Sequence, residues 1–280
     1  MKLNIVCKVK NKEYNPELEG LISAASEVNE GLYVWQEGTK ETYDMFYECS
    51  PDIIICTDNS IDKTLSNALS KNPKTKLIAI GNNTPSHSVP SLTCYAGASG
   101  TNEYNLLSAA NVVTYQHRPS QEIYKSEITS ISEAETPVIH QLSQFAVKCF
   151  SMIKKLRYPN YIGRIIPQEI PSIISSTNVY LDVDGNNNIL LTSMFNKSPC
   201  LSVSSTMFDA EIMPRPADLE ELIACIKTLV SQKKTREEHI KKCYDFAIKN
   251  TYFHRISDIF SLLGYEDHSK ESLLAIGKYI

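Results

Sequence analysis

One stretch, residues 178–204, constrains the fold of this chain more than any other. It opens with alternating β-branched and apolar residues, passes through Asp184-Gly185-Asn186, continues as a short helical run and meets Pro199 before a second apolar run. Gly and Asn tolerate positive φ, and Asn or Asp can cap a helix, so the three residues predict a tight turn. A strand, turn, helix and strand in this order place a helix N-terminus at the carboxyl edge of a parallel sheet, where anionic ligands bind.

The N-terminal half predicts the same alternation of strand and helix. Residues 82–100 are rich in Ser, Thr, Pro and Gly and are predicted to form a long loop, which in a compact domain is usually functional. Alternation of this kind indicates a parallel sheet with right-handed crossovers. The predicted strands are 3–9, 31–36, 51–58, 75–82 and 111–117, and the predicted helices are 16–29, 39–49, 61–72 and 104–110.

A polar segment without periodicity, residues 130–136, precedes Pro137 and is predicted to be a linker between two domains. A second α/β series follows, with predicted strands at 137–143 and 159–165 and helices at 144–156, 167–177, 219–232, 235–250 and 251–264. Residues 269–280 are predicted to form a terminal helix that returns to the first domain. The expected division is therefore 1–135, 136–264 and a C-terminal tail or helix, 265–280.

Composition sets outer limits on the class of protein. With 280 residues, 42% of them hydrophobic and 21% charged, the chain can form one large domain or two domains of ordinary size. It has no apolar run near the ~20 residues of a membrane span and no signal-peptide pattern, so a cytoplasmic protein without a membrane partner is expected. Eight cysteines without a CxxC pair favour reduced thiols over a disulfide framework or a zinc site, and no metal is expected.

The central stretch also resembles the donor-binding segment of GT-B-type glycosyltransferases. In that family an acidic residue is followed by seven residues, a second acidic residue, a small-residue turn and a proline. Asp184 matches the first carboxylate and Pro199 the proline, whereas Thr192 stands where the second carboxylate would be. The helices after Asp218 resemble the closing helices of the family's group 1 and spore-coat members, so the similarity covers roughly residues 137–264. The central stretch is equally compatible with an ordinary βαβ unit of any doubly wound domain.

The resemblance implies an α/β protein with two Rossmann-like domains facing a cleft, and an enzyme that transfers a sugar from a nucleotide-sugar. The donor, expected to be UDP-linked, is then a co-substrate, and no bound cofactor is expected. Asp184 would contact the sugar and Thr192 the ribose, while Arg164 would neutralise the diphosphate. Alternatively, Arg164 is a solvated surface residue and the three asparagines are turn residues. The predicted donor-binding set is Arg164, Asp184, Gly185, Asn186, Asn187, Asn188 and Thr192.

Three residues of the first half are candidates for the base that activates the acceptor. Asp58 ends a predicted strand, His87 lies in the long loop, and His117 follows a predicted strand. The carboxyl ends of parallel strands form the edge that carries binding sites, and histidine titrates near neutral pH. Each of the three is also explained as a turn or capping residue.

The identity of the acceptor stays open at this level. Residues 1–135 carry 11 Lys+Arg against 17 Asp+Glu, which argues against generic nucleic-acid binding. Two local basic clusters nevertheless permit one hypothesis, transfer to a hydroxymethylated base in phage duplex DNA. Polysaccharide, protein and small-molecule acceptors are alternatives, as is a non-catalytic nucleotide-sugar binder. The two clusters are Lys8, Lys10 and Lys12, and Lys71, Lys74 and Lys76.

Overall fold

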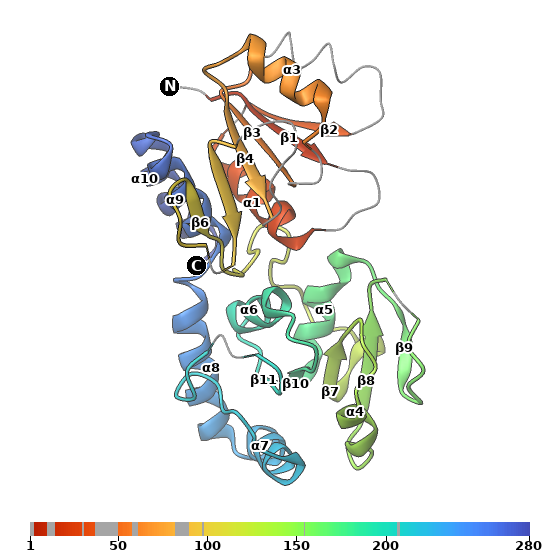
Figure 1. Ribbon diagram of the computed structural model, residues 1–280. Helices are drawn as coiled ribbons and strands as arrows, with labels where there is room; N and C mark the ends of the chain where they lie inside the picture. The colour runs from red at the N-terminus through yellow and green to blue at the C-terminus, as the bar shows by residue number, and fades with distance from the viewer. Residues whose placement is uncertain are drawn as a thin grey trace. The chain divides into compact units, whose positions relative to one another are not determined.

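The computed structural model describes residues 3–9, 15–29, 31–36, 50–57, 61–81, 90–96, 98–153, 155–205 and 208–280 (Figure 1). The chain divides into two compact units. The first unit consists of Met1–Ser108 together with Tyr252–Ile280, and the second is Ala109–Thr251. Each unit has its own parallel sheet, so the two predicted α/β series are confirmed as two separate sheets.

Within the described residues, the sheet of the first unit has the strand order β2-β1-β3-β4-β5-β6, and each neighbouring pair is parallel. The last two strands differ from the prediction, because β5 lies in the expected loop 82–100 and β6 overlaps the start of the expected helix 104–110. Both are short, and a few residues show no period that separates strand from helix. The bounds are β1 Ile5–Val9, β2 Leu32–Gln36, β3 Ile53–Thr57, β4 Lys76–Ile80, β5 Leu92–Tyr95 and β6 Glu103–Asn105.

The helices of the first unit begin where capping residues stand. Asn15 accepts from the N–H of Leu18 at the start of α1 (Pro16–Val28), and Asp62 caps α3 (Lys63–Lys71) in the same way. The predicted helix 39–49 lies outside the described residues. Helices α9 (Tyr252–Leu262) and α10 (Glu266–Ala275), followed by the short η4 (Ile276–Lys278), pack on one another and on α1. The expected return of the C-terminal helix to the first unit is therefore confirmed (Figure 1).

Close packing and one buried charge shape the core of the first unit. A Cβ atom on Gly20 of α1 would lie 2.2 Å from the ring of Tyr252, so glycine is what allows α1 and α9 to approach. Lys8 of β1 is fully buried, and its Nζ lies 2.8 Å from Oδ2 of Asp62. Asp62 thus caps α3 and pairs with Lys8, which joins the helix to the sheet.

In the second unit, the described strands follow the order β11-β10-β7-β8-β9, again with every neighbouring pair parallel. Three predictions made near the start of this unit are wrong. Strand β7 extends into the start of the supposed linker, helix α4 (Pro137–Gln141) replaces a predicted strand, and β8 replaces a predicted helix. The bounds are β7 Ser126–Ile131, β8 Val147–Ser151, β9 Tyr161–Arg164, β10 Thr177–Asp182 and β11 Cys200–Ser202.

These errors have local causes. Pro137 is favourable at the first position of a helix, where its missing N–H has no partner to lose. Residues 147–151 are almost completely buried between two neighbouring strands, and a short apolar run of this kind reads equally well as a buried helix segment. Residues 112–115 form turns instead of the predicted strand 111–117.

The helices predicted at 167–177, 219–232 and 235–250, and the helical run within 178–204, are confirmed. Asp218 caps α7 (Leu219–Ser231), whose Leu222, Ile226 and Leu229 enter the core at helical spacing. That core also holds the inward residues of β7, β8, β10 and β11. The other helical segments are η2 Glu122–Tyr124, η3 Pro167–Glu169, α5 Ile170–Ser175, α6 Asn187–Phe195 and α8 Lys233–Ala247.

The division between the units differs from the expected boundary near residue 135. It falls between Ser108 and Ala109, and again between Thr251 and Tyr252. The physical reason is pairing, because β7 hydrogen-bonds to β8 and β10 and thereby belongs to the second sheet. Among the described residues, no helix has both the length and the apolar character needed to cross a membrane.

Candidate functional site

The carboxyl ends of the strands in the second unit bring polar residues to one edge of its sheet. Asp182 ends β10 and pairs in register with Ser202, which ends β11. On the other side of the sheet centre, Ser151 of β8 pairs with Arg164 of β9. In open parallel sheets ligands bind at this edge, so we expect a binding site here.

Asp182 organises the turn at this edge. Its Oδ1 accepts from the backbone N–H groups of Gly185 at 3.1 Å and Asn186 at 3.0 Å. Its Oδ2 accepts from Oγ of Ser202 at 2.6 Å and, more weakly, from Oγ of Ser204 at 3.4 Å. The side chain is fully buried. Sequence reasoning missed this residue, although an Asp three residues before a Gly at a strand end is a signal for such a turn.

Burial dominates the electrostatics of Asp182. Desolvation raises the pKa of its carboxyl above the ordinary value, the hydrogen bond from Ser202 opposes this, and the neighbouring Asp184 raises the pKa further. Since Gly185 has φ +80°, a conformation that side chains rarely adopt, the turn needs both the buried carboxylate and the glycine. The turn is therefore built by Asp182 and Gly185 together.

Asp184, the predicted sugar-binding residue, is exposed at the same edge. Its Oδ2 accepts from the backbone N–H of Glu133 at 2.9 Å. The carboxylate of Glu133 in turn accepts from the N–H groups of Met152 at 2.5 Å and Ile153 at 3.1 Å. The segments that follow β7, β8 and β10 are thus tied together by two acidic side chains, of which the sequence indicated only Asp184.

Arg164 also lies at this edge, as predicted, but not beside Asp184. It is exposed, and its Nη1 donates to the carbonyl oxygen of Ile153 over 3.4 Å. Strand β9 is three strands away from β10, and strands in a sheet are spaced by 4.7–4.9 Å, which puts the two chain positions about 14 Å apart across the edge. Only an elongated ligand would contact both.

The three asparagines make contacts within the protein. Asn186 caps α6, with its Oδ1 accepting from the N–H of Ile189 at 3.3 Å, so the capping prediction is confirmed. Oδ1 of Asn187 accepts from Oγ of Ser205 at 2.6 Å. Asn188 is buried, and its Oδ1 accepts from the N–H of Ala109 at 3.2 Å. The partly exposed Asn186 and Asn187 stay in the predicted set at the edge, while Asn188 supports the structure behind it.

Thr192 does not reach the edge of the sheet. Its side chain is 1% exposed, and its hydroxyl has no hydrogen-bond partner among the described residues. It lies in the second turn of α6, on a helix whose residues from Asn188 to Phe195 are all buried. The position that carries the second carboxylate in the resembling family is therefore enclosed here, and a ribose contact from Thr192 stays a prediction.

The three candidate bases have separate outcomes. Asp58 and His87 lie outside the described residues, so their roles stay predictions. The expected place of His117 at a strand end in the first half is wrong. His117 lies in the second unit, with Nδ1 3.5 Å from Oγ of Ser175. Ser175 precedes the amino end of β10, and that six-residue strand alone spans about 20 Å before the carboxyl edge that holds Asp184.

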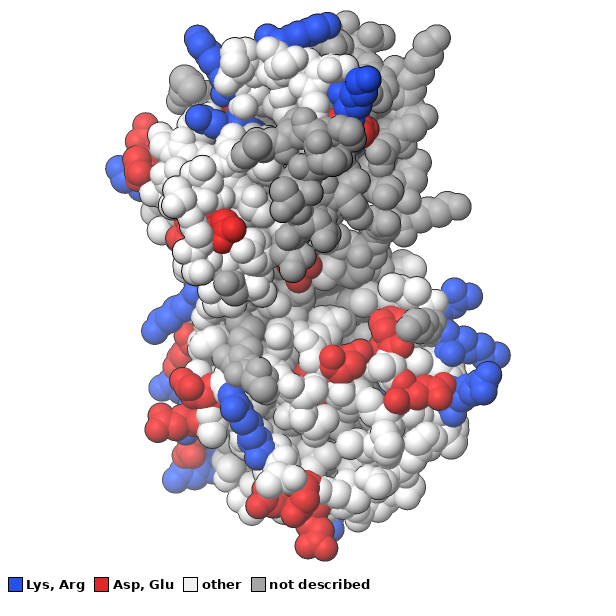
Figure 2. All heavy atoms as spheres, viewed as in Figure 1, with Lys and Arg blue, Asp and Glu red and all other residues white. Residues whose placement is uncertain are grey.

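Where the structure describes them, the lysines considered for contacts with DNA phosphates differ in their burial. Lys8 lies in a strand and is buried against Asp62, so the expectation that it contacts phosphate is wrong. Lys10 and Lys12 lie outside the described residues, whereas Lys71, Lys74 and Lys76 are exposed. Over the part of the second unit visible in Figure 2, described basic and acidic side chains are interspersed and form no continuous basic stripe.

No family model matches this sequence, and no curated protein matches it at the level of sequence. Solved structures match the chain by their fold. HepE of Anabaena, in complex with UDP and glucose, superposes with a TM-score of 0.61 at 11% identity, over 92% of this chain and 99% of that one. A protein described as a UDP-N-acetylglucosamine 2-epimerase of Listeria monocytogenes gives a TM-score of 0.54 at 9% identity, over 93% and 96%.

A third similar structure is the glycotransferase of kitacinnamycin, with a TM-score of 0.50 at 9% identity, covering 94% of this chain and 100% of that one. Identities this low show the fold alone. The chain has the GT-B fold, with two Rossmann-like units, as the resemblance in residues 137–264 implied.

Proposed function

We propose that this protein is a glycosyltransferase that uses a nucleotide-sugar, with UDP as the nucleotide, and binds it at the carboxyl edge of the second sheet. The observation that carries the proposal is the turn after β10, where buried Asp182 holds the chain so that exposed Asp184 and the start of α6 share one edge. The GT-B fold, and the UDP and glucose held by the similar HepE structure, support the choice of ligand.

The chemistry of the edge suits such a donor. Asp184 would accept hydrogen bonds from hydroxyl groups of the sugar. The N-terminus of the nine-residue helix α6 carries a partial positive charge that stabilises negative charge as the nucleoside diphosphate leaves. Arg164, about 14 Å across the edge by strand spacing, supplies the cation at the other end of an elongated ligand.

Asp58 and His87 are our proposal for the base that activates the acceptor. Asp58 comes directly after Thr57, the last residue of β3, and His87 comes in the segment after β4. Strands β3 and β4 are parallel neighbours in the first sheet. The acceptor itself is best sought with a panel of sugars, small hydroxylated molecules and hydroxymethylated duplex DNA.

A donor and acceptor assay tests the proposal with Asp184→Asn as the decisive variant. The amide keeps an oxygen for the N–H of Glu133 but lacks the charge that would bind a sugar hydroxyl. A hydrogen bond to a charged group contributes about 1.5–3 kcal/mol and one to a neutral group about 0.5–1.5 kcal/mol. Loss of the charge should therefore cost about 1–1.5 kcal/mol, and kcat/KM for release of UDP should fall by about 5- to 10-fold. Asp245→Asn, which changes an exposed carboxylate on α8, is the matched control and should leave the rate unchanged. Equal rates for the Asp184→Asn variant and the wild type would refute the assignment of Asp184.

A non-catalytic nucleotide-sugar-binding protein is the second candidate. It is favoured by one specific observation, the enclosed Thr192 where the resembling enzymes have a second carboxylate. Calorimetry with UDP-sugars separates the two, because a binder shows saturable affinity with no release of UDP across the acceptor panel. Absence of both binding and turnover would exclude the two candidates together.

A further inference from the structure

Two cysteines and a histidine that are distant in sequence come together in the second unit. Cys200 is the first residue of β11, while His239 and Cys243 lie on α8. One ligand atom from each lies within 4.8 Å of the others, and all three residues are buried. Residues four apart on a helix share one face, so α8 presents His239 and Cys243 side by side.

The distances fit a small tetrahedral ion. Sγ of Cys243 lies 3.6 Å from Nε2 of His239 and 4.0 Å from Nδ1. With zinc bonds of about 2.3 Å to sulfur and about 2.0 Å to nitrogen, two tetrahedral ligands stand about 3.6 Å apart. Sγ of Cys243 and Nδ1 of His239 would therefore need to approach by about 0.4 Å. The ligand atom of Cys200 lies within 4.8 Å of the other two and would need to approach by about 1 Å at most.

The imidazole of His239 is already held as metal ligands usually are. Its Nε2 lies 2.8 Å from the carbonyl oxygen of Cys200. When Nε2 donates to that carbonyl, Nδ1 keeps its lone pair for a ligand, and a backbone carbonyl is a common partner for the second nitrogen of a metal-binding histidine. The thiol of Cys243 points to the carbonyl oxygen of Ile212 at 3.6 Å, a weak contact that a deprotonated sulfur would give up.

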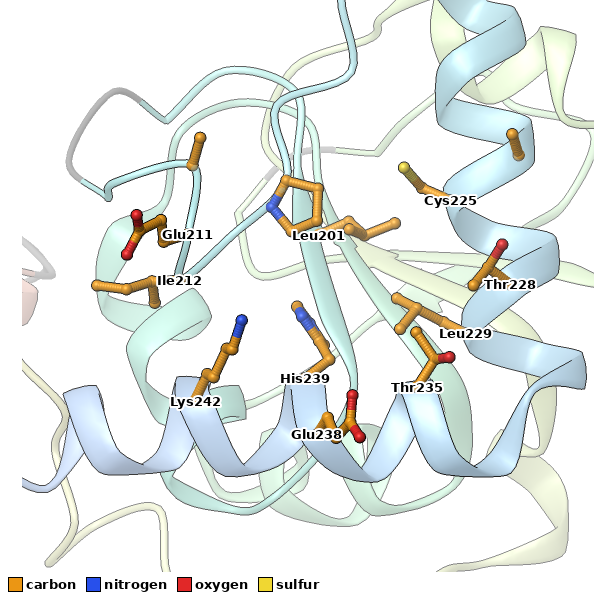
Figure 3. A pocket seen from close by; sticks show the side chains of 13 residues that line it. Leu201, Glu211, Ile212, Cys225, Thr228, Leu229, Thr235, Glu238, His239 and Lys242 are labelled. Atoms are coloured by element: carbon orange, nitrogen blue, oxygen red, sulfur yellow. The ribbon is translucent and has the colours of Figure 1, made fainter.

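The charge of the three side chains and the access of solvent to them also suit a divalent cation. Two thiolates, one neutral imidazole and a divalent cation sum to zero, so the buried site would hold no uncompensated charge. His239 also lines a cavity of about 410 Å³ between α7, α8 and residues 210–214, together with Cys225 and Lys242 (Figure 3). The carboxylates of Glu211 and Glu238 line it as well. A water in this cavity can complete a tetrahedral shell.

We propose that Cys200, His239 and Cys243 bind one Zn²⁺ ion, with water from the neighbouring cavity as the fourth ligand. Sulfur and imidazole ligands select zinc over magnesium or calcium. On binding, both thiols release their protons to solvent and no electrons are transferred. The ion would join β11 to α8 and does not depend on the proposed sugar transfer.

Metal analysis of the whole protein tests the site. Wild-type protein, stripped with a chelator and returned to Zn²⁺, should hold one equivalent after gel filtration. The variants Cys243→Ser and His239→Ala should bind zinc at least about 100-fold more weakly, since even outer partners of a metal ligand contribute 10- to 100-fold. Cys149→Ser is the matched control, because Cys149 is another buried cysteine of the second unit but lies on β8, outside the cluster.

A second measurement uses the wild type alone, so it tests the site even if the variants do not fold. Co²⁺ in place of Zn²⁺ should produce thiolate-to-metal charge-transfer absorption and the visible bands of a tetrahedral ion, both reversed by added Zn²⁺. Protein that takes up no stoichiometric zinc and shows no thiolate–cobalt absorption would overturn the proposal. Loss of zinc from the Cys149→Ser variant to the same extent as from Cys243→Ser would overturn it as well.

Discussion

Replacing Asp182 by Ala should destabilise the second unit strongly. The substitution removes the acceptor of two backbone N–H groups, from Gly185 and Asn186, and of the 2.6 Å bond from Ser202. Each N–H lies in a partly buried turn and should lose about 1 kcal/mol, and the charged hydrogen bond about 1.5–3 kcal/mol. Relief of the buried carboxylate, whose pKa desolvation raises, offsets part of the loss. The net cost is about 2–4 kcal/mol.

The measurement is thermal unfolding followed by circular dichroism and by calorimetry. A loss of this size should lower the midpoint of the transition that involves the second unit by about 5–15 °C. Asp184→Ala is the control, because this exposed carboxylate gives up one hydrogen bond, from the N–H of Glu133, and should cost about 1 kcal/mol or less. Equal shifts for the two variants would refute the view that Asp182 builds the turn and that Asp184 serves the ligand.

Two further predictions concern pH and packing. Because the pKa of Asp182 is raised in the folded protein, the native state binds more protons than the unfolded chain between about pH 4 and the raised pKa. Its stability relative to the Asp182→Asn variant should therefore fall as pH rises through this window. Urea unfolding of both proteins over a pH series checks this, and a difference that stays constant or grows with pH would contradict it. Gly20→Ala should cost about 1–3 kcal/mol, since the new Cβ would lie 2.2 Å from the ring of Tyr252. Gly277→Ala is the control in the same unit, because among the described residues no atom beyond its own chain neighbourhood lies within 4 Å of the added Cβ. Equal melting temperatures for the two variants would show that α1 and α9 tolerate the extra carbon.

Sequence reasoning identified the features that a few neighbouring residues fix between themselves. The strand, turn, helix and strand of residues 178–204 were predicted in the right order, with Gly185 at positive φ and Asn186 as the cap of α6. The amphipathic helix α7 followed from its spacing. The turn, the cap and the helical spacing join residues at most four positions apart, so the local pattern contains them.

Tertiary pairing decided the region between residues 90 and 151. Strands β5, β6, β7 and β8 are three to six residues long, too short for a period, and their state depends on the strands that pair with them. Because β7 pairs with β8 and β10, it belongs to the second unit. The boundary between the units therefore lies after Ser108 and not near residue 135, where the sequence predicted it. Non-local pairing of this kind leaves no signal in a single stretch of sequence.

The polar centres of the second unit divide in the same way. The sequence indicated Asp184, Gly185 and Arg164 at one sheet edge, but not the burial of Asp182 or the link from Asp184 to Glu133. The spacing of His239 and Cys243 was visible in the sequence, yet their third partner, Cys200, is 39 residues away from His239. Neighbouring residues determine local hydrogen bonds such as caps and turns. Burial and long-range contacts form only when the sheet brings distant strands and helices together.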